Sequence, residues 1–115
     1  MKILITGSEG FVGRELVNNF LERDYDVVGL DRVKLSEDRY KFHKIDLGKN
    51  ITLPPDNYDL VIHCAAAKGD WGITKDEFYR DNVLATKNLL IYLKKCVVQR
   101  LIHFSTVSIY SRLSH

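Results

Sequence analysis

Residues 2–13 read KILITGSEGFVG, and two different spacings of apolar residues meet inside this stretch. The run Ile3-Leu4-Ile5 is short and apolar and contains two β-branched isoleucines, which favours a buried parallel strand that stops at Gly7. From Phe11 onward apolar residues recur about every four positions, which is typical of a helix, as far as about Arg23. The stretch therefore predicts a strand, a tight turn and a helix in direct succession.

The same alternation of strand and helix continues along the chain. Its apolar runs predict four further strands and one long helix: residues 27–31, 42–45, 60–64 and 101–104 for the strands, and 75–96 for the helix. Pro54 and Pro55 exclude a long helix from the connection 46–59, so one face of the sheet is expected to be thinly covered. Alternating strands and helices imply right-handed crossovers and an α/β fold with three layers: a doubly wound parallel sheet in the order 3-2-1-4-5.

The length of 115 residues fits one domain, residues 1–115, and leaves no room for a second, substrate-binding lobe. Hydrophobic residues make up 45% and charged residues 28%, as in soluble globular proteins. No apolar run approaches the roughly 20 residues that span a bilayer, and no secretory signal begins the chain, so we expect no membrane association and a cytoplasmic location. A net charge of +2, spread along the chain, gives no reason to expect nucleic-acid binding.

Three glycines, Gly7, Gly10 and Gly13, lie between the first strand and its helix. The first permits a tight turn, the second lets the backbone approach a pyrophosphate, and the third lets helix and strand pack closely. Amides at the helix start then bind an anion. The alternative is an ordinary strand-to-helix turn. Asp31 favours the first interpretation, because it ends the second strand near the expected position of a carboxylate that binds ribose.

Asp31 also bears on which dinucleotide binds. A carboxylate accepts hydrogen bonds from a free ribose 2′-hydroxyl but repels a 2′-phosphate, so NAD is favoured over NADP. Arg32, the next residue, can pair with a 2′-phosphate, but the interpretation we favour is a solvated surface arginine.

These residues resemble the extended short-chain dehydrogenase/reductases, the NAD-dependent epimerase/dehydratase group, of which this chain looks like the N-terminal Rossmann part. The spacing G-x-x-G-x-x-G, with Phe11 and Val12 inside it, is typical of that group. The likeness covers essentially the whole chain and continues through four stretches: DL at 46–47, HCAA at 63–66, NVLATKNLL at 82–90 and FSTVSIY at 104–110.

The resemblance implies roles for individual residues. The cofactor contacts predicted at the glycine turn and at the end of the second strand are Gly7, Gly10, Phe11, Val12, Gly13, Asp31 and Arg32. To these the resemblance adds Asp46 and Leu47 against the adenine, Cys64, Ala65, Ala66 and Ala67 in the crevice at the end of the fourth strand, Lys68 at the nicotinamide ribose, and Asn82 on the long helix. Thr106 matches the family's catalytic Ser/Thr, and no metal ligand is implied.

Each polar position also has a structural interpretation. Asp46 suits a solvated acid at a strand end, Lys68 a surface lysine and Asn82 a helix cap, because such residues usually lie exposed. Thr106 suits a β-branched strand residue. His63 and His103 lie within apolar runs, which favours structural histidines over catalysts.

The family's chemistry requires Y-x-x-x-K on a helix, where the lysine lowers the tyrosine pKa. One match exists, Tyr40 to Lys44, but it leads into a strand, where four residues of rise separate the two groups by about 13 Å. We interpret that match as coincidence. Tyr110 has Ser114 four places on, so it is not the catalytic tyrosine either.

Three functions remain open. The favoured one is the NAD-binding portion of an epimerase, dehydratase or dehydrogenase acting on a nucleotide sugar or a related hydroxylated substrate. The second is a non-catalytic dinucleotide-binding module. The third is a 3β-hydroxysteroid-dehydrogenase-like protein, suggested only by Asp70-Trp71-Gly72. We expect the chain alone to catalyse no hydride transfer, and its open strand edge to favour self-association, for example as a homodimer.

Overall fold

The fold is built on one parallel sheet, and the computed structural model describes residues 1–34, 38–64 and 75–104 of the chain. Five strands form this sheet in the order β3-β2-β1-β5-β7. Their bounds are Lys2–Thr6 for β1, Asp26–Asp31 for β2, Lys41–Lys44 for β3, Leu60–His63 for β5 and Leu101–His103 for β7. All four pairings are parallel. The predicted strand order is confirmed.

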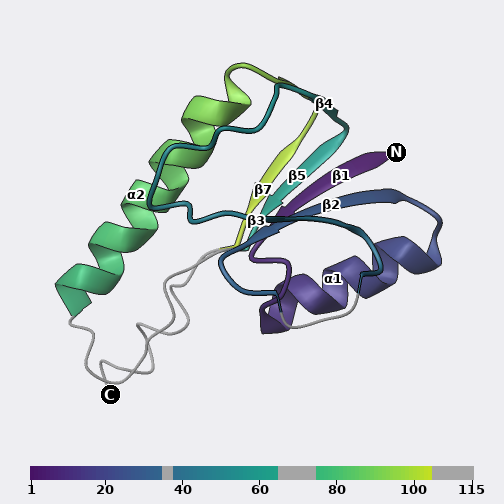
Figure 1. Ribbon diagram of the computed structural model, residues 1–115, viewed down its shortest axis with the longest axis horizontal. Coiled ribbons are helices and arrows are strands. Elements are labelled where there is room, and N and C mark those ends of the chain that lie inside the picture. Colours follow the sequence, from purple (N-terminus) through teal and green to yellow (C-terminus); the bar gives the residue numbers. More distant parts are fainter. Residues whose placement is uncertain (35–37, 65–74, 105–115) are drawn as a thin grey trace.

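Two helices cover opposite faces of the sheet, as Figure 1 shows. α1 (Phe11–Glu22) buries Val17 in a cluster with Ile3, Ile5, Val27 and Ile62. α2 (Lys75–Leu93) packs its buried side chains on the opposite face, among Leu4, Val28, Leu30 and Val61. Neighbouring residues of β1 thus point to opposite layers, as the pleat of a strand dictates. The three-layer architecture is therefore confirmed, with α2 ending three residues before the predicted bound of 96.

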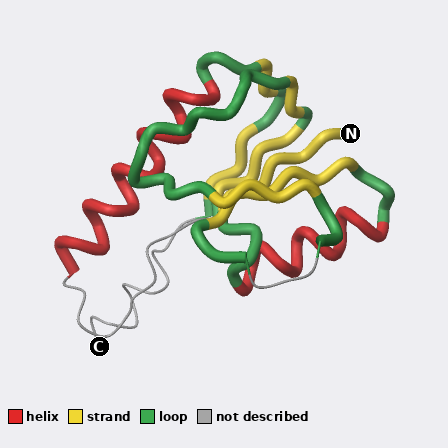
Figure 2. Tube along the Cα trace, viewed as in Figure 1, coloured by secondary structure: helices red, strands yellow, loops and turns green. Residues whose placement is uncertain are grey.

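The connection between β3 and β5 contains no helix among its residues, as Figure 2 shows, in agreement with the effect expected of Pro54 and Pro55. Its side chains nevertheless cover the sheet: Leu47 is buried, and Ile51 and Leu53 pack against the same cluster. Extended chain therefore covers the part of this face that a crossover helix covers in other doubly wound folds.

A second, two-stranded sheet was not expected from the sequence. β4 (Asn57–Tyr58) pairs in parallel with β6 (Val97–Val98). Strands of two residues are too short to show alternation, so the sequence pattern carried no signal for them. Their pairing fixes the end of α2 next to the start of β5.

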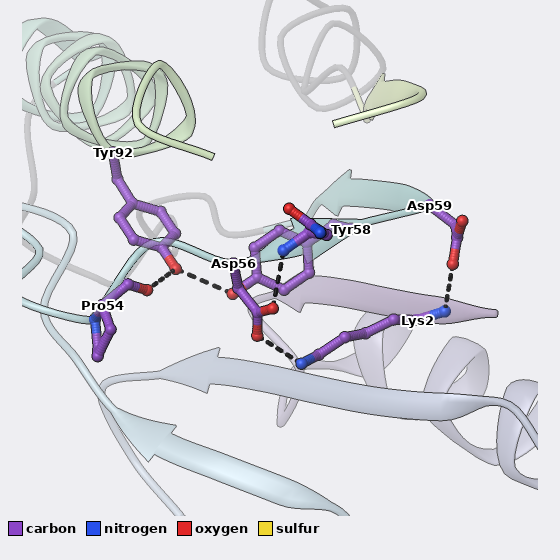
Figure 3. Close-up of polar contacts among 7 residues, drawn as sticks. Lys2, Pro54, Asp56, Tyr58, Asp59 and Tyr92 are labelled. Atoms are coloured by element: carbon purple, nitrogen blue, oxygen red, sulfur yellow. Dashed lines mark hydrogen bonds and ion pairs between the residues drawn. The ribbon is translucent and has the colours of Figure 1, made fainter. Parts of the chain in front are cut away.

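Polar contacts tie these segments together (Figure 3). The Tyr92 hydroxyl donates to the Pro54 carbonyl at 2.9 Å and lies 2.9 Å from the Tyr58 hydroxyl. Because a carbonyl only accepts, Tyr58 is left to donate to Tyr92. On the other side of Tyr58, the Lys2 ammonium pairs with Asp56. Burial raises the pKa of Tyr58, which keeps its hydroxyl a donor.

Candidate functional site

The glycine turn follows β1 directly and is fixed by backbone hydrogen bonds. Gly7 has a φ of 68°, which glycine adopts without a steric penalty. Its amide donates to the Leu30 carbonyl at 2.7 Å, so the turn is joined to β2. The Gly10 amide then donates to the Gly7 carbonyl at 3.0 Å, which closes the turn immediately before α1.

α1 begins without a side-chain cap, because its N-cap residue is Gly10. The first turn is open to solvent: Phe11 is 89% exposed and Val12 is 44% exposed. The first amides of a helix have no intrahelical acceptor and carry the positive end of the macrodipole. This end of α1 therefore offers donors to an anion that approaches over Gly10.

Gly13 is the glycine of closest packing. A Cβ at Gly13 would lie 2.0 Å from the Gly7 carbonyl oxygen, a separation that no side chain tolerates. A Cβ at Gly10 would meet that oxygen at 3.3 Å and nothing nearer. The close packing predicted for the third glycine is thus found at Gly13, whereas the ligand approach predicted for Gly10 stays a prediction.

Asp31 ends β2 beside this turn and holds it. Its carboxylate accepts from the Glu9 amide at 3.0 Å through Oδ2 and from the Arg32 amide at 2.7 Å through Oδ1. Oδ1 also accepts from the Val33 amide at 3.4 Å, whereas Oδ2 accepts from the Glu9 amide alone. The side chain is half-buried, so the second lone pair of Oδ2 can still accept from a ligand hydroxyl. Arg32 is exposed. The structure thus brings Asp31 to the glycine turn, as its place in the sequence predicted.

Tyr40 packs against the glycine turn, a role that was not predicted from the sequence. Its ring occupies the space above Gly29, where a Cβ would lie 2.3 Å from the ring. Its hydroxyl lies 2.9 Å from Ser8 Oγ and 2.8 Å from Glu9 Oε2. Burial raises the pKa of Tyr40 to about 12, the opposite of what a catalytic tyrosine needs. Since Lys44 lies along the following strand β3, this geometry agrees with our interpretation of the Y-x-x-x-K match as coincidence.

His63 lies at the carboxyl ends of the central strands with both ring nitrogens occupied. Nδ1 lies 2.6 Å from the Thr6 hydroxyl, and Nε2 lies 3.1 Å from the Thr86 hydroxyl on α2. Burial, with a smaller contribution from His103, lowers the pKa of His63 to about 4. The neutral ring joins β1, β5 and α2, which supports the structural interpretation of this histidine. His103 is exposed and lies against the His63 ring at 4.8 Å between centroids.

Further predicted contacts lie along the same edge of the sheet. Asp46 is exposed and caps the turn at Gly48, whose amide it accepts at 2.8 Å. Leu47 places its side chain in the core, and its carbonyl accepts from the Asn88 side chain at 2.6 Å. Asn88 lies in the stretch 82–90 that the resemblance singled out, yet its positioning role was not anticipated.

The remaining predicted residues divide into two groups. Cys64 is half-buried at the end of β5, where burial raises its thiol pKa to about 11, and Asn82 is half-buried on α2. Other residues singled out by the sequence lie outside the described residues: Ala65, Ala66, Ala67, Lys68, Asp70, Trp71, Gly72, Thr106 and Tyr110. Their expected roles stay predictions.

The described residues contain neither a metal-binding cluster nor a membrane-spanning helix. Between residues 1 and 104, outside the gaps, no group of three or more His, Cys, Asp or Glu is placed to hold a metal ion. No helix of the described chain is long and apolar enough to cross a membrane.

Comparison with known proteins finds the same arrangement elsewhere. A 2-alkyl-3-oxoalkanoate reductase of Stenotrophomonas maltophilia is 28% identical over 100% of this chain, which spans 36% of that protein. A decarboxylating sterol-4-alpha-carboxylate 3-dehydrogenase of Bos taurus is 33% identical over 91% of this chain and 30% of its own length. The solved structure of MoeE5 in complex with UDP-glucuronic acid and NAD superposes with a TM-score of 0.77 at 30% identity, covering 96% of this chain and 38% of that one.

The chain therefore spans about a third of the length of these relatives. A sequence model described as the NAD dependent epimerase/dehydratase family matches residues 3–115, which is nearly every residue. The glycine turn, Asp31 and all of the parallel sheet except its first residue, Lys2, lie inside the matched range. The chain belongs to the NAD dependent epimerase/dehydratase family.

Proposed function

We propose that this chain is the NAD-binding Rossmann domain of a larger epimerase, dehydratase or dehydrogenase. The observation that carries the proposal is the joined pair of glycine turn and Asp31, in which the Asp31 carboxylate accepts the Glu9 amide. An uncapped helix start suits a pyrophosphate, and a carboxylate a short distance away suits a ribose diol. The bound cofactor would supply hydride transfer.

The chain's own residues would bind and orient that cofactor. The amides from Gly10 onward would hold the pyrophosphate, and Asp31 would accept from the adenosine ribose. Asp46 borders the adenine side, and Cys64 borders the crevice at the end of β5. Arg32 is the residue that would reverse the preference toward NADP.

The substrate we favour is a nucleotide sugar, because MoeE5 is solved with UDP-glucuronic acid and NAD. A hydroxysteroid is the second candidate, favoured by the likeness to the sterol dehydrogenase. Thr106 is the residue we propose to contact the substrate hydroxyl. We also propose self-association, which the exposed apolar side chains of α2 and β7 support, among them Val83, Leu90, Leu101 and Ile102.

Product analysis of the longer protein that carries this chain tests the substrate class. The protein is incubated with NAD and either UDP-sugars or 3β-hydroxysteroids, and products are separated by chromatography, because an epimerase regenerates its NAD and shows no net absorbance change. We expect a new sugar epimer or dehydration product that disappears in Thr106→Ala. Turnover of steroids alone would select the second candidate, and turnover of neither class would contradict both.

A further inference from the structure

A cavity of about 280 Å³ lies on the α2 face of the sheet, away from the glycine turn. Its lining includes Val28 of β2, Lys41 at the start of β3, and Tyr58, which comes shortly before β5. Because the strands are parallel, these residues lie toward the amino ends of the strands, whereas the glycine turn and Asp31 lie at the carboxyl ends. The cavity is therefore separate from the proposed dinucleotide site.

Rings and apolar side chains form most of the cavity walls. Leu53 packs against the hydrophobic cluster beneath α2, and Pro54 and Pro55 follow it in the connection between β3 and β5. The hydroxyl of Tyr92, a further lining residue, is already bonded to the Pro54 carbonyl and to the Tyr58 hydroxyl (Figure 3). These walls thus present flat, largely apolar surface, against which an aromatic ring packs well.

Two nitrogen-bearing side chains of β3 also line the cavity, and both are open to a ligand. Lys41 is exposed and His43 is half-buried, and neither makes a hydrogen bond or an ion pair with a residue that the structure describes. Burial, with a smaller contribution from Lys41, lowers the pKa of His43, so the imidazole is neutral near pH 7 and keeps one N–H donor. Lys41 supplies a full positive charge, which an anionic group on a ligand would balance.

Asp56 is the acidic residue of the lining, but its charge is already balanced. Its Oδ2 pairs with the Lys2 ammonium, and its Oδ1 accepts from the Asn57 amide at 2.7 Å (Figure 3). The charge of Lys41 is therefore left for a ligand, although Lys41 is near enough to Asp56 for the two charges to interact. One available positive charge beside a fixed carboxylate suits a ligand with a single negative charge, because Asp56 would repel a second one.

We propose that this cavity is a binding site for a small aromatic monocarboxylate, whose carboxylate bonds to Lys41 and His43 and whose ring packs against the prolines and tyrosines. Ligand pockets usually enclose about 300 to 1,000 Å³, so a cavity of this size admits a molecule of one or two rings rather than a dinucleotide. The ammonium and the imidazole N–H both donate to the carboxylate, and hydrogen bonds to an ionised group are the stronger ones. The inference goes beyond the proposed dinucleotide function, because it uses no residue of the glycine turn.

Amide chemical shifts of the full chain, recorded while 2-naphthoate is added, test the proposal. We expect saturable changes at Val28, Lys41, His43 and Tyr58, with a dissociation constant on the order of 1 mM, as is usual for a ligand of this size. 2-Naphthamide has the same rings without the charge and should bind about fivefold more weakly. Inorganic phosphate, which has the charge without a ring, should cause no saturable change at these amides.

Two variants test the residues that would hold the carboxylate. Lys41→Gln removes the charge at an exposed position and should weaken 2-naphthoate binding about fivefold, while the affinity for 2-naphthamide changes by less than about twofold. His43→Phe keeps a ring but removes the N–H donor and should weaken 2-naphthoate binding about threefold. The matched control is Lys44→Gln, an exposed lysine of the same strand outside the cavity lining, which should leave both affinities unchanged.

Saturating NAD distinguishes this cavity from the proposed cofactor site. NAD should change the dissociation constant of 2-naphthoate by less than about twofold, because the two sites lie at opposite ends of the strands. Displacement of 2-naphthoate by NAD, or changes centred on the glycine turn, would place the ring in the cofactor site and overturn the inference. Equal affinity for 2-naphthamide, equal affinity in Lys41→Gln, or no saturable change at the cavity would overturn it as well. A chain that binds 2-naphthoate at the cavity but does not bind NAD contradicts the proposed function alone.

Discussion

At the scale of the residue, Asp31 joins two segments that are far apart in the chain. Its carboxylate accepts from amides on the glycine turn and on its own strand end. A side chain that organises a loop through hydrogen bonds is already oriented when a ligand arrives, which lowers the entropic cost of binding. The half-buried position leaves the second lone pair of Oδ2 available to a ligand, since Oδ1 already accepts from the Arg32 and Val33 amides.

Gly10→Val is the residue-scale prediction. We expect dinucleotide binding to be lost while the fold persists, because the added side chain would lie where we propose that the pyrophosphate approaches. The nearest atom to a Cβ at this position is the Gly7 oxygen at 3.3 Å, which small shifts accommodate. The measurement is the rise in melting temperature on adding NAD, with circular dichroism to monitor the fold. A folded variant whose melting temperature rises as much as that of the wild type would show that the loop is only a turn.

At the scale of the element, α1 depends on its distance from β1. A Cβ at Gly13 would lie 2.0 Å from the Gly7 oxygen and 2.9 Å from the Ser8 Cα. Both are backbone atoms, which cannot move away by a side-chain rotation. Helix and strand must separate to admit even a methyl group.

Gly13→Ala should therefore destabilise the domain by about 1 to 3 kcal/mol, the usual cost of overpacking, against a gain of at most about 1 kcal/mol in helix propensity. The free energy of unfolding in urea measures this loss. Gly10→Ala is the matched control and should cost less, since its Cβ meets the Gly7 oxygen at 3.3 Å. Equal losses in the two variants would contradict the packing argument.

The elements also show what the sequence could and could not predict. β1, β2, β5 and α1 carry regular spacings, and the structure places each of them within a residue or two of the prediction. The glycine turn and Asp31 could be found because their spacing follows from backbone geometry. The contact of Tyr40 with the glycine turn could not be predicted, because its partner Glu9 is distant in the sequence and only the folding of the chain brings the two side chains together.

At the scale of the whole molecule, His63 makes stability depend on pH. The pKa of His63 is about 4 in the folded chain against an ordinary 6.5. Between these values the imidazole is protonated in the unfolded chain and neutral in the folded chain. Stability is complete above pH 6.5 and falls as the pH decreases toward 4, by up to about 3 kcal/mol.

Urea unfolding across that pH range tests the prediction. His63→Gln should flatten the pH dependence, whereas His103→Gln, at an exposed position, should keep most of it, because burial is the larger cause of the shift. An unchanged slope in His63→Gln would assign the pH dependence to other groups.

The account's central claim is that a dinucleotide binds at the glycine turn and the end of β2, and amide chemical shifts recorded during a titration with NAD test it most directly. We predict that the largest changes occur at the amides of Gly7, Glu9, Gly10, Phe11 and Arg32, with little change in the separate two-stranded sheet of β4 and β6. Saturable changes confined to β4 and β6, or no changes at the glycine turn at saturating NAD, would contradict the claim.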